Sequence, residues 1–256
     1  MRAKTTNVLP IALLALLVVG ALPAQHEAEQ KKEPGTPASD AAGADQATRA
    51  MSSRQVDMGP HMKMTTLRPP QAADARRAER VVGAARIALE KYRDVRVAEA
   101  DGYRIFLPQV PQKMYHFTNY AYGFEAGMGF DPTRPTSLLY EKNGDEYRLV
   151  GAMYTAPARF SEEELHQRIP LSVAQWHAHV NLCLPPSEKR RQAWGRKPRF
   201  GLRGSIATRE ECEAEDGWFI PQVFGWMVHM YPFETAAEKI WSLEPQKPGK
   251  EHSHSH

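Results

Sequence analysis

Apolar and polar residues along this chain follow three successive patterns, and each pattern predicts a different structure. Residues 8–22 form an unbroken apolar run. Apolar residues then recur at spacings of three and four over 75–92, which is typical of an amphipathic helix. Beyond Tyr103 the spacing changes to alternation, interrupted by Pro, Gly and Asn, which is typical of strands and turns.

The two later patterns together predict a single α+β domain over 69–245. The Pro69-Pro70 pair opens the amphipathic helix, and shorter helical segments are expected over 95–100 and 161–168. We expect the N-terminal helix to pack on a mostly antiparallel β-sheet or a partial barrel. The alternating runs predict strands over 115–120, 137–141, 147–155, 175–182 and 224–231, with a hairpin turn at Asn143-Gly144.

The N-terminal apolar run predicts a cleavable signal peptide over 1–24. Arg2 and Lys4 precede the run, and the small residue Ala24 stands at the cleavage point. A helix over 8–22 is about 22 Å long, short of the roughly 30 Å hydrocarbon core of a bilayer, so a signal peptide is favoured over a membrane anchor. We therefore expect a periplasmic or secreted protein with no transmembrane anchor after cleavage.

Polar segments flank the predicted domain on both sides. Residues 25–68 have few aromatic or β-branched residues over most of their length, which predicts a disordered tether. Residues 246–256 end in alternating His and Ser, a flexible metal-chelating tail that is either native or a cloning remnant. The chain has 33 Lys and Arg against 30 Asp and Glu. Loss of Arg2 and Lys4 leaves a net charge of about +1, which argues against a nucleic-acid binder.

Two cysteines, Cys183 and Cys212, bracket a basic segment. In an oxidising compartment they predict one disulfide, which in the chain-entropy model stabilises a protein by about 3–4 kcal/mol. The alternative makes Cys183 a metal-binding thiolate. Residues 189–209 are rich in Lys and Arg and carry Trp194 and Phe200, so this loop is either a docking surface for an anionic partner or a solvated surface loop.

Histidines in the predicted strands are the candidate metal ligands. Alternate residues of a strand share a face, so His177 and His179 are expected side by side, about 6.5–7 Å apart at the backbone. His229, in the run 224–231, is the expected third ligand, and His116 is the fourth candidate. Imidazoles at this spacing suit a transition metal, with copper first and zinc or iron as alternatives. The competing interpretation makes each one an ordinary hydrogen-bonded strand histidine.

Polar neighbours and soft ligands extend this prediction. Asn119, Asn181 and Tyr231 are expected to orient the imidazoles. At the end of the tether, Met58 precedes a group of soft ligands that forms a candidate accessory metal site. Thioether and imidazole together favour copper, particularly Cu(I), whereas the alternative is a mobile stretch whose methionines dock on the domain. The accessory candidates are His61, Met62 and Met64.

Several of these stretches resemble known proteins. Over roughly 71–234 the chain resembles a group of secreted bacterial proteins of unassigned function, which implies export and one domain. The segments that carry this resemblance are 92–94, 98–103, 116–119, 149–154, 176–183 and 225–232, among them WHAHVNLC and GWMVHMYP. The His177, His179 and His229 set is also similar to cupins, which place an H-x-H pair on one barrel strand and a further His on another. The cupin glycine framing and following carboxylate are absent, with Asn181 and Cys183 in their place.

Three functions are consistent with these patterns. The first is an exported transition-metal-binding protein, with copper favoured, whose site lies on a sheet face. The second is a mononuclear metalloenzyme, an oxidoreductase or hydrolase, in which three histidines leave a position for water or dioxygen. The third is a non-metal envelope module that binds an anionic partner. The chain has no G-x-S-x-G, P-loop, dinucleotide-binding or C-x-x-C-H motif, so the sequence does not predict those chemistries.

Overall fold

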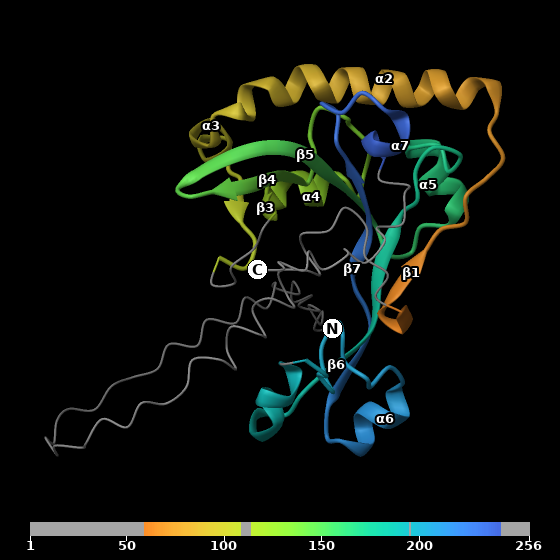
Figure 1. Ribbon diagram of the computed structural model, residues 1–256. Helices are drawn as coiled ribbons and strands as arrows, with labels where there is room; N and C mark the ends of the chain where they lie inside the picture. Colours follow the sequence, from red (N-terminus) through yellow and green to blue (C-terminus); the bar gives the residue numbers. More distant parts are fainter. Residues whose placement is uncertain (1–58, 109–113, 195, 242–256) are drawn as a thin grey trace, which may run out of the picture. The chain divides into compact units, whose positions relative to one another are not determined.

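Seven strands form one antiparallel sheet, which is the frame of the α+β structure in Figure 1. The computed structural model describes residues 59–108, 114–194 and 196–241. The strand order in the sheet is β1-β6-β7-β5-β4-β3-β2. The predicted fold class is therefore confirmed. The strands are β1 (Met62–Met64), β2 (Arg104–Ile105), β3 (Met114–Thr118), β4 (Ser137–Asn143), β5 (Glu146–Ala156), β6 (His177–Leu184) and β7 (Trp218–Met230).

Helices connect and cover these strands. The amphipathic pattern gives α2, and the capping box at Ser161 and Glu164 starts α5 as predicted. The α-helices are α2 (Ala72–Leu89), α3 (Val95–Ala100), α4 (Tyr120–Glu125), α5 (Glu162–Arg168), α6 (Arg209–Ala214) and α7 (Ala237–Ile240). The 3-10 helices are η1 (Gly59–His61), η2 (Glu90–Arg93) and η3 (Ser187–Ala193).

One face of the sheet packs against α2, as Figure 1 shows. The helix contributes a buried stripe of small and branched residues at helical spacing: Ala78, Val81, Val82, Ala85 and Leu89. Burial of each Val or Leu side chain stabilises the folded state by about 1.5–3 kcal/mol, so the packing of α2 on this face supplies much of the stability of the apolar core. The sheet residues in the same cluster alternate along their strands: Phe117, Leu138, Tyr140, Ala152, Tyr154, Trp176, Ala178, Trp226, Val228 and Met230.

The opposite face carries the remaining alternate residues, among them all four candidate histidines, and we call it the histidine face. Register places Met153 opposite His229, Leu139 opposite His116 and Met227 opposite His177. Directly opposed residues in an antiparallel pair share a face. The histidine face is thus separate from the α2-covered core.

The sheet curves strongly toward the histidine face. β3 and β7 are three strand steps apart, which is about 14 Å in a flat sheet. Nevertheless the rings of His116 and His229 lie 5.6 Å apart. Phe106, just after β2, likewise reaches Phe224 of β7 at 5.8 Å between ring centroids. These contacts require the curved, partly closed arrangement that a partial barrel provides.

A register shift in β7 contributes to this curvature. Pairing with β6 slips between His177 and His179, and Phe224 adopts a φ of 63°. A β-bulge of this kind bends a strand and redirects its side chains. Gly225 is required next to it, because a Cβ there would lie 1.9 Å from the carbonyl oxygen of Ala156.

The chain enters the sheet earlier than the sequence suggests. Residues 59–68 fall within the predicted tether, but η1 precedes β1, and β1 pairs with β6 as an edge strand. His61 is buried, and backbone hydrogen bonds continue the docking through Thr65, whose amide donates to Trp176. The predicted signal peptide, cleavage point and histidine-rich tail lie outside the described residues.

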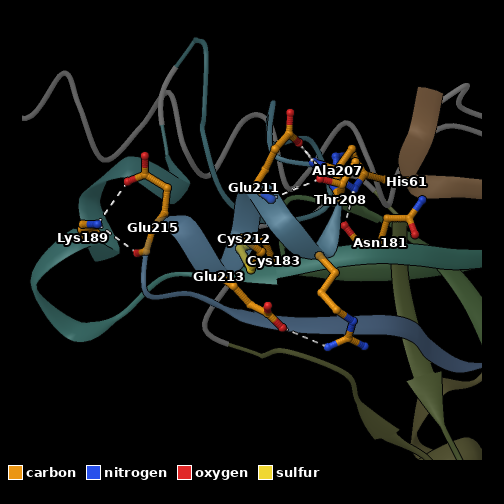
Figure 2. Close-up of a disulfide and its surroundings, with 11 residues drawn as sticks. His61, Asn181, Cys183, Lys189, Ala207, Thr208, Glu211, Cys212, Glu213 and Glu215 are labelled. Carbon is orange, nitrogen blue, oxygen red and sulfur yellow. Dashed lines mark hydrogen bonds and ion pairs between the residues drawn. A yellow bond between two sulfur atoms is a disulfide. The ribbon is translucent and has the colours of Figure 1, made fainter.

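A disulfide holds the segment between β6 and β7. Cys183 on β6 and Cys212 on α6 are joined, as Figure 2 shows, so Cys183 is not a thiolate metal ligand. Gly217 packs against both sulfur atoms, where a Cβ would lie only 2.6 and 2.8 Å away. A disulfide agrees with folding in an oxidising compartment. In the described part of the chain, no helix is both long and apolar enough to cross a membrane.

We expect removal of this disulfide to destabilise the protein. The bridge closes a sequence separation of 29 residues, so in the chain-entropy model Cys183→Ala/Cys212→Ala lowers the free energy of unfolding by about 3–4 kcal/mol. Urea denaturation at pH 7 measures the loss. The double variant should not respond to a reducing agent, whereas the unaltered chain should; a loss below about 1 kcal/mol would contradict the expectation.

A buried carboxylate on α2 predicts a pH dependence of stability. The Ser172 hydroxyl donates to Asp74 at 2.6 Å, and this bond, with weaker help from the Gln71 backbone, His166 and Arg77, holds the pKa of Asp74 below its usual value despite its burial. A lowered pKa stabilises the folded state fully above the unfolded value near 3.9, and the gain disappears as pH falls through the folded pKa.

Asp74→Asn tests that linkage. We expect the variant to unfold about 1–2 kcal/mol more easily at pH 7, because a hydrogen bond to a charged acceptor is lost. The difference should shrink as pH falls below about 4, where Asp74 of the unfolded chain takes up its proton, and should disappear below the lower pKa of the folded chain. Urea denaturation at a series of pH values measures it, and a difference that does not vary with pH would refute the assignment.

Candidate metal centre

Four histidines from three strands meet on the histidine face. His116 lies on β3, His177 and His179 lie on β6, and His229 lies on β7. Ring centroids are 5.7 Å apart for His177 and His179, 5.2 Å for His177 and His229, and 5.6 Å for His116 and His229. The structure therefore brings together all four histidines that the sequence selects, and we call them the histidine cluster.

Burial favours the uncharged form of three of the four imidazoles. Burial, with smaller effects from His229 and His179, lowers the pKa of His116 to about 3. Burial and the neighbouring imidazoles, His229 first, also put the pKa of His177 well below its ordinary value, and burial lowers the pKa of His179. A neutral imidazole keeps one nitrogen lone pair available to accept a proton, a hydrogen bond or a metal ion.

Two ring nitrogens of the cluster are buried without a hydrogen-bond partner. They are Nδ1 of His116 and Nδ1 of His179, two of the four such side-chain atoms among the described residues. Leaving a buried polar atom unpaired costs about 1–3 kcal/mol. Buried polar groups are paired in most proteins, so two unpaired nitrogens in one cluster are unusual and mark it as a candidate binding site.

Accessibility differs within the cluster. His116 is buried, with 9% of its surface exposed, whereas the histidines of β6 and β7 are half-buried. His116 is thus the least exposed residue of the cluster.

Methionines border the cluster across the neighbouring strands. On β1, Met62 lies opposite His179 and Met64 lies opposite His177. On the other side of β6, Met227 of β7 also lies opposite His177. The sequence singled out Met62 and Met64 but not Met227, because only the β6–β7 register reveals its position.

A second methionine group lies further along the same face. Met153 lies opposite His229, and Met114 packs with Leu139 and Tyr231 in a small buried cluster. The sequence pattern does not distinguish Met114 or Met153 as site residues. Their alternation with core-facing residues of β3 and β5 was the available signal, but it gave no reason to separate them from ordinary apolar residues.

The spacing of the rings suits a metal ion, although their orientation does not yet do so. An ion about 2.0–2.1 Å from each ring nitrogen, at tetrahedral angles, holds imidazole centroids about 5 Å apart. The three measured distances are 5.2–5.7 Å, but the contacts of His177 with His179 and His229 are edge-to-face. Among the residues described, no group of three or more His, Cys, Asp or Glu side chains could hold a metal ion as it stands.

The residues expected to orient the imidazoles have other contacts. Asn119 caps α4 by accepting from the Tyr122 amide and donates its own side-chain amide to Asp101. Asn181 donates to the carbonyl of Pro60. Tyr231 lies on the histidine face, and its hydroxyl donates to the Met114 sulfur at 3.7 Å. An orienting role for these three residues stays a prediction.

His61 anchors the N-terminal strand. Its Nδ1 lies 2.9 Å from the carbonyl oxygen of Asn181, and its Nε2 lies 2.7 Å from that of Gly204. Figure 2 shows His61 directed toward Asn181 beside the disulfide. The accessory metal role stays a prediction for His61, and binding a metal would require it to give up one of these contacts.

Acidic residues partly neutralise the basic segment. Lys189 and Arg199 both pair with Glu215, and Arg209 pairs with Glu213. Trp194 is 53% exposed, whereas Phe200 is fully buried against the disulfide. Binding of an anionic partner to this segment stays a prediction.

Comparisons with protein-family models, curated proteins and solved structures find no match to this chain. The resemblance to secreted bacterial proteins and the cupin-like histidine arrangement therefore stay predictions.

A stability measurement can separate a functional His116 from a structural one. Because its buried Nδ1 has no partner, we expect His116→Leu to leave the free energy of unfolding unchanged or to raise it by about 1 kcal/mol in the presence of a chelator. The neighbouring core change Phe117→Ala should instead cost about 3–5 kcal/mol. A loss above about 2 kcal/mol for His116→Leu would mean that the histidine is needed for folding.

Proposed function

We propose that this protein is an exported transition-metal-binding protein, with copper favoured, whose site is formed by His116, His177, His179 and His229. The single observation that carries the proposal is the meeting of four imidazoles from three strands, three with a pKa lowered by burial and two with unpaired buried nitrogens. Their ring spacing supports it, because neighbouring rings lie 5.2–5.7 Å apart, close to the separation of two imidazoles on one ion. Rotations of the rings would be needed to direct their nitrogens at a common ion. The terminal side-chain torsion of histidine has a broad energy minimum, so such rotations are inexpensive.

The number of rings favours binding over catalysis. A catalytic zinc-type site keeps three protein ligands and an open position for water, whereas a closed site uses four. The cluster offers four imidazoles. A cavity of about 210 Å³ lies beside α4, lined by residues including Tyr122, Glu125 and Arg134, and none of the four histidines lines it. We therefore place metal storage or transfer ahead of a metalloenzyme.

Export is the second part of the proposal. The disulfide supports an oxidising compartment. The N-terminal sequence adds the basic residues, apolar run and small residue of a signal peptide. We place the protein in the periplasm or outside the cell, where it would bind the ion after export.

Metal content of the purified chain tests the proposal. His252, His254 and His256 are first replaced by alanine, so that the tail does not contribute. We expect this reference chain to bind one equivalent of Cu or Zn. His177→Ala/His179→Ala in the same background should lower the affinity by about 100-fold or more, since even partners that only orient a ligand are worth 10–100-fold.

The control for that experiment is His166→Gln on α5, outside the cluster. It should bind metal like the reference chain. Circular dichroism and a urea unfolding curve check that each variant is folded. Equal metal binding by the reference chain and the double variant, or no binding by either, would overturn the proposal.

A further inference from the structure

His177 is flanked by methionines on both sides. Met64 of β1 and Met227 of β7 are its direct cross-strand partners. Directly opposed residues in an antiparallel sheet have Cβ atoms about 4.5–5.5 Å apart, within reach of a flexible thioether. The three side chains therefore form one row across three strands on the histidine face.

β1 is held so that its methionines stay on this face. Lys63, between them, turns to the other side, where its ammonium lies 5.2 Å from the Trp226 ring. His61 anchors one end of the strand, and at the other end the Thr65 hydroxyl accepts from the Trp176 amide at 3.0 Å. Contacts of His61 and Thr65 thus hold the two ends of this short strand. The cation–π contact of Lys63 holds its side chain on the side opposite the methionines.

Soft ligands in this row select among metals. Thioethers favour Cu(I), whereas imidazole alone also suits zinc, Cu(II), iron and nickel. The same face holds two further methionines, Met114 and Met153, which pack in a cluster around Leu139 and Tyr231. The sulfur-bearing residues therefore surround the imidazoles rather than lying scattered over the sheet.

Resting on the proposed function, we infer that the site takes copper as Cu(I), with the thioethers of Met64 and Met227 acting together with the imidazole of His177. The remaining histidines of the cluster supply further nitrogen ligands. Met62, opposite His179, lies one row away and is an alternative sulfur position during transfer of the ion. A mixed sulfur and nitrogen environment stabilises Cu(I) over Cu(II) and discriminates against zinc.

Matched methionine variants test the inference, again in the background without the three tail histidines. Met64→Leu/Met227→Leu removes the row, and such volume-conserving changes cost less than about 1.5 kcal/mol each, so the fold is expected to survive. Competition with a chromophoric Cu(I) chelator under anaerobic, reducing conditions measures the Cu(I) affinity. We expect a loss of about 10-fold or more for Cu(I), equivalent to about 1.4 kcal/mol, with zinc affinity changed less than about threefold.

The control is Met128→Leu/Met230→Leu. Met230 lies on β7 but belongs to the α2-covered core, and Met128 is 74% exposed. This variant should bind Cu(I) like the reference chain. Equal Cu(I) affinity for the Met64/Met227 variant and this control would overturn the inference, while metal loss in the histidine variant would still support the proposed function.

A spectroscopic measurement covers the case in which the Leu variants fail to fold. Selenomethionine-labelled reference chain is loaded with Cu(I), and the selenium absorption edge is recorded. We expect a copper neighbour in the selenium environment, which disappears in a Zn-loaded sample prepared without copper. Selenium without a copper neighbour in a chain that holds one equivalent of Cu(I) would overturn the inference; a reference chain that holds no metal would overturn the proposed function instead.

Discussion

The candidate metal centre depends on the curvature of the sheet. Three strand steps separate β3 from β7, so His116 and His229 would lie far apart on a flat surface. Curvature toward the histidine face brings their rings to 5.6 Å. The bulge at Phe224 bends β7, and the absence of a Cβ at Gly225 allows the close approach to Ala156 beside it. These two local backbone features therefore help to bring the four histidines together.

Much of the fold follows from periodicity. The helical spacing before Tyr92 became α2, the five alternating runs became β3, β4, β5, β6 and β7, and the Asn143-Gly144 step lies where β4 ends. β1 was missed because three residues are too short for alternation to be recognised. Their pairing is decided by long-range contacts of His61 and Thr65, which no local pattern reveals.

The sequence predicted which histidines belong to the candidate site, but not how close together they lie. Alternation on β6 and β7 correctly placed His177, His179 and His229 away from the apolar face. Their convergence with His116 needed the strand order and the curvature, neither of which a local pattern encodes. The sequence did not distinguish Met227 and Met153 from ordinary core residues, since a methionine in an apolar strand usually fills space in the core.

The cluster also shows how an unfavourable local arrangement is tolerated. Neutral imidazoles with unpaired buried nitrogens cost free energy, and the apolar packing of α2 on the opposite face offsets that cost. The residues of the main apolar core thus lie on the face that α2 covers, and the residues of the candidate site lie on the histidine face. Substitutions on the histidine face can therefore test the proposed metal preference while leaving the main apolar core intact.

The position of β1 affects how the protein acquires its site during folding. The contact between His61 and Asn181 spans 120 residues of sequence, and β1 pairs with β6 over a similar separation. Contacts between such distant segments form late, because closing a long loop costs entropy before any contact compensates for it. We therefore expect Met62 and Met64 to reach the histidines late in folding. On the proposed function, a partly folded chain would bind a soft ion less tightly, so high affinity and correct folding would arise together.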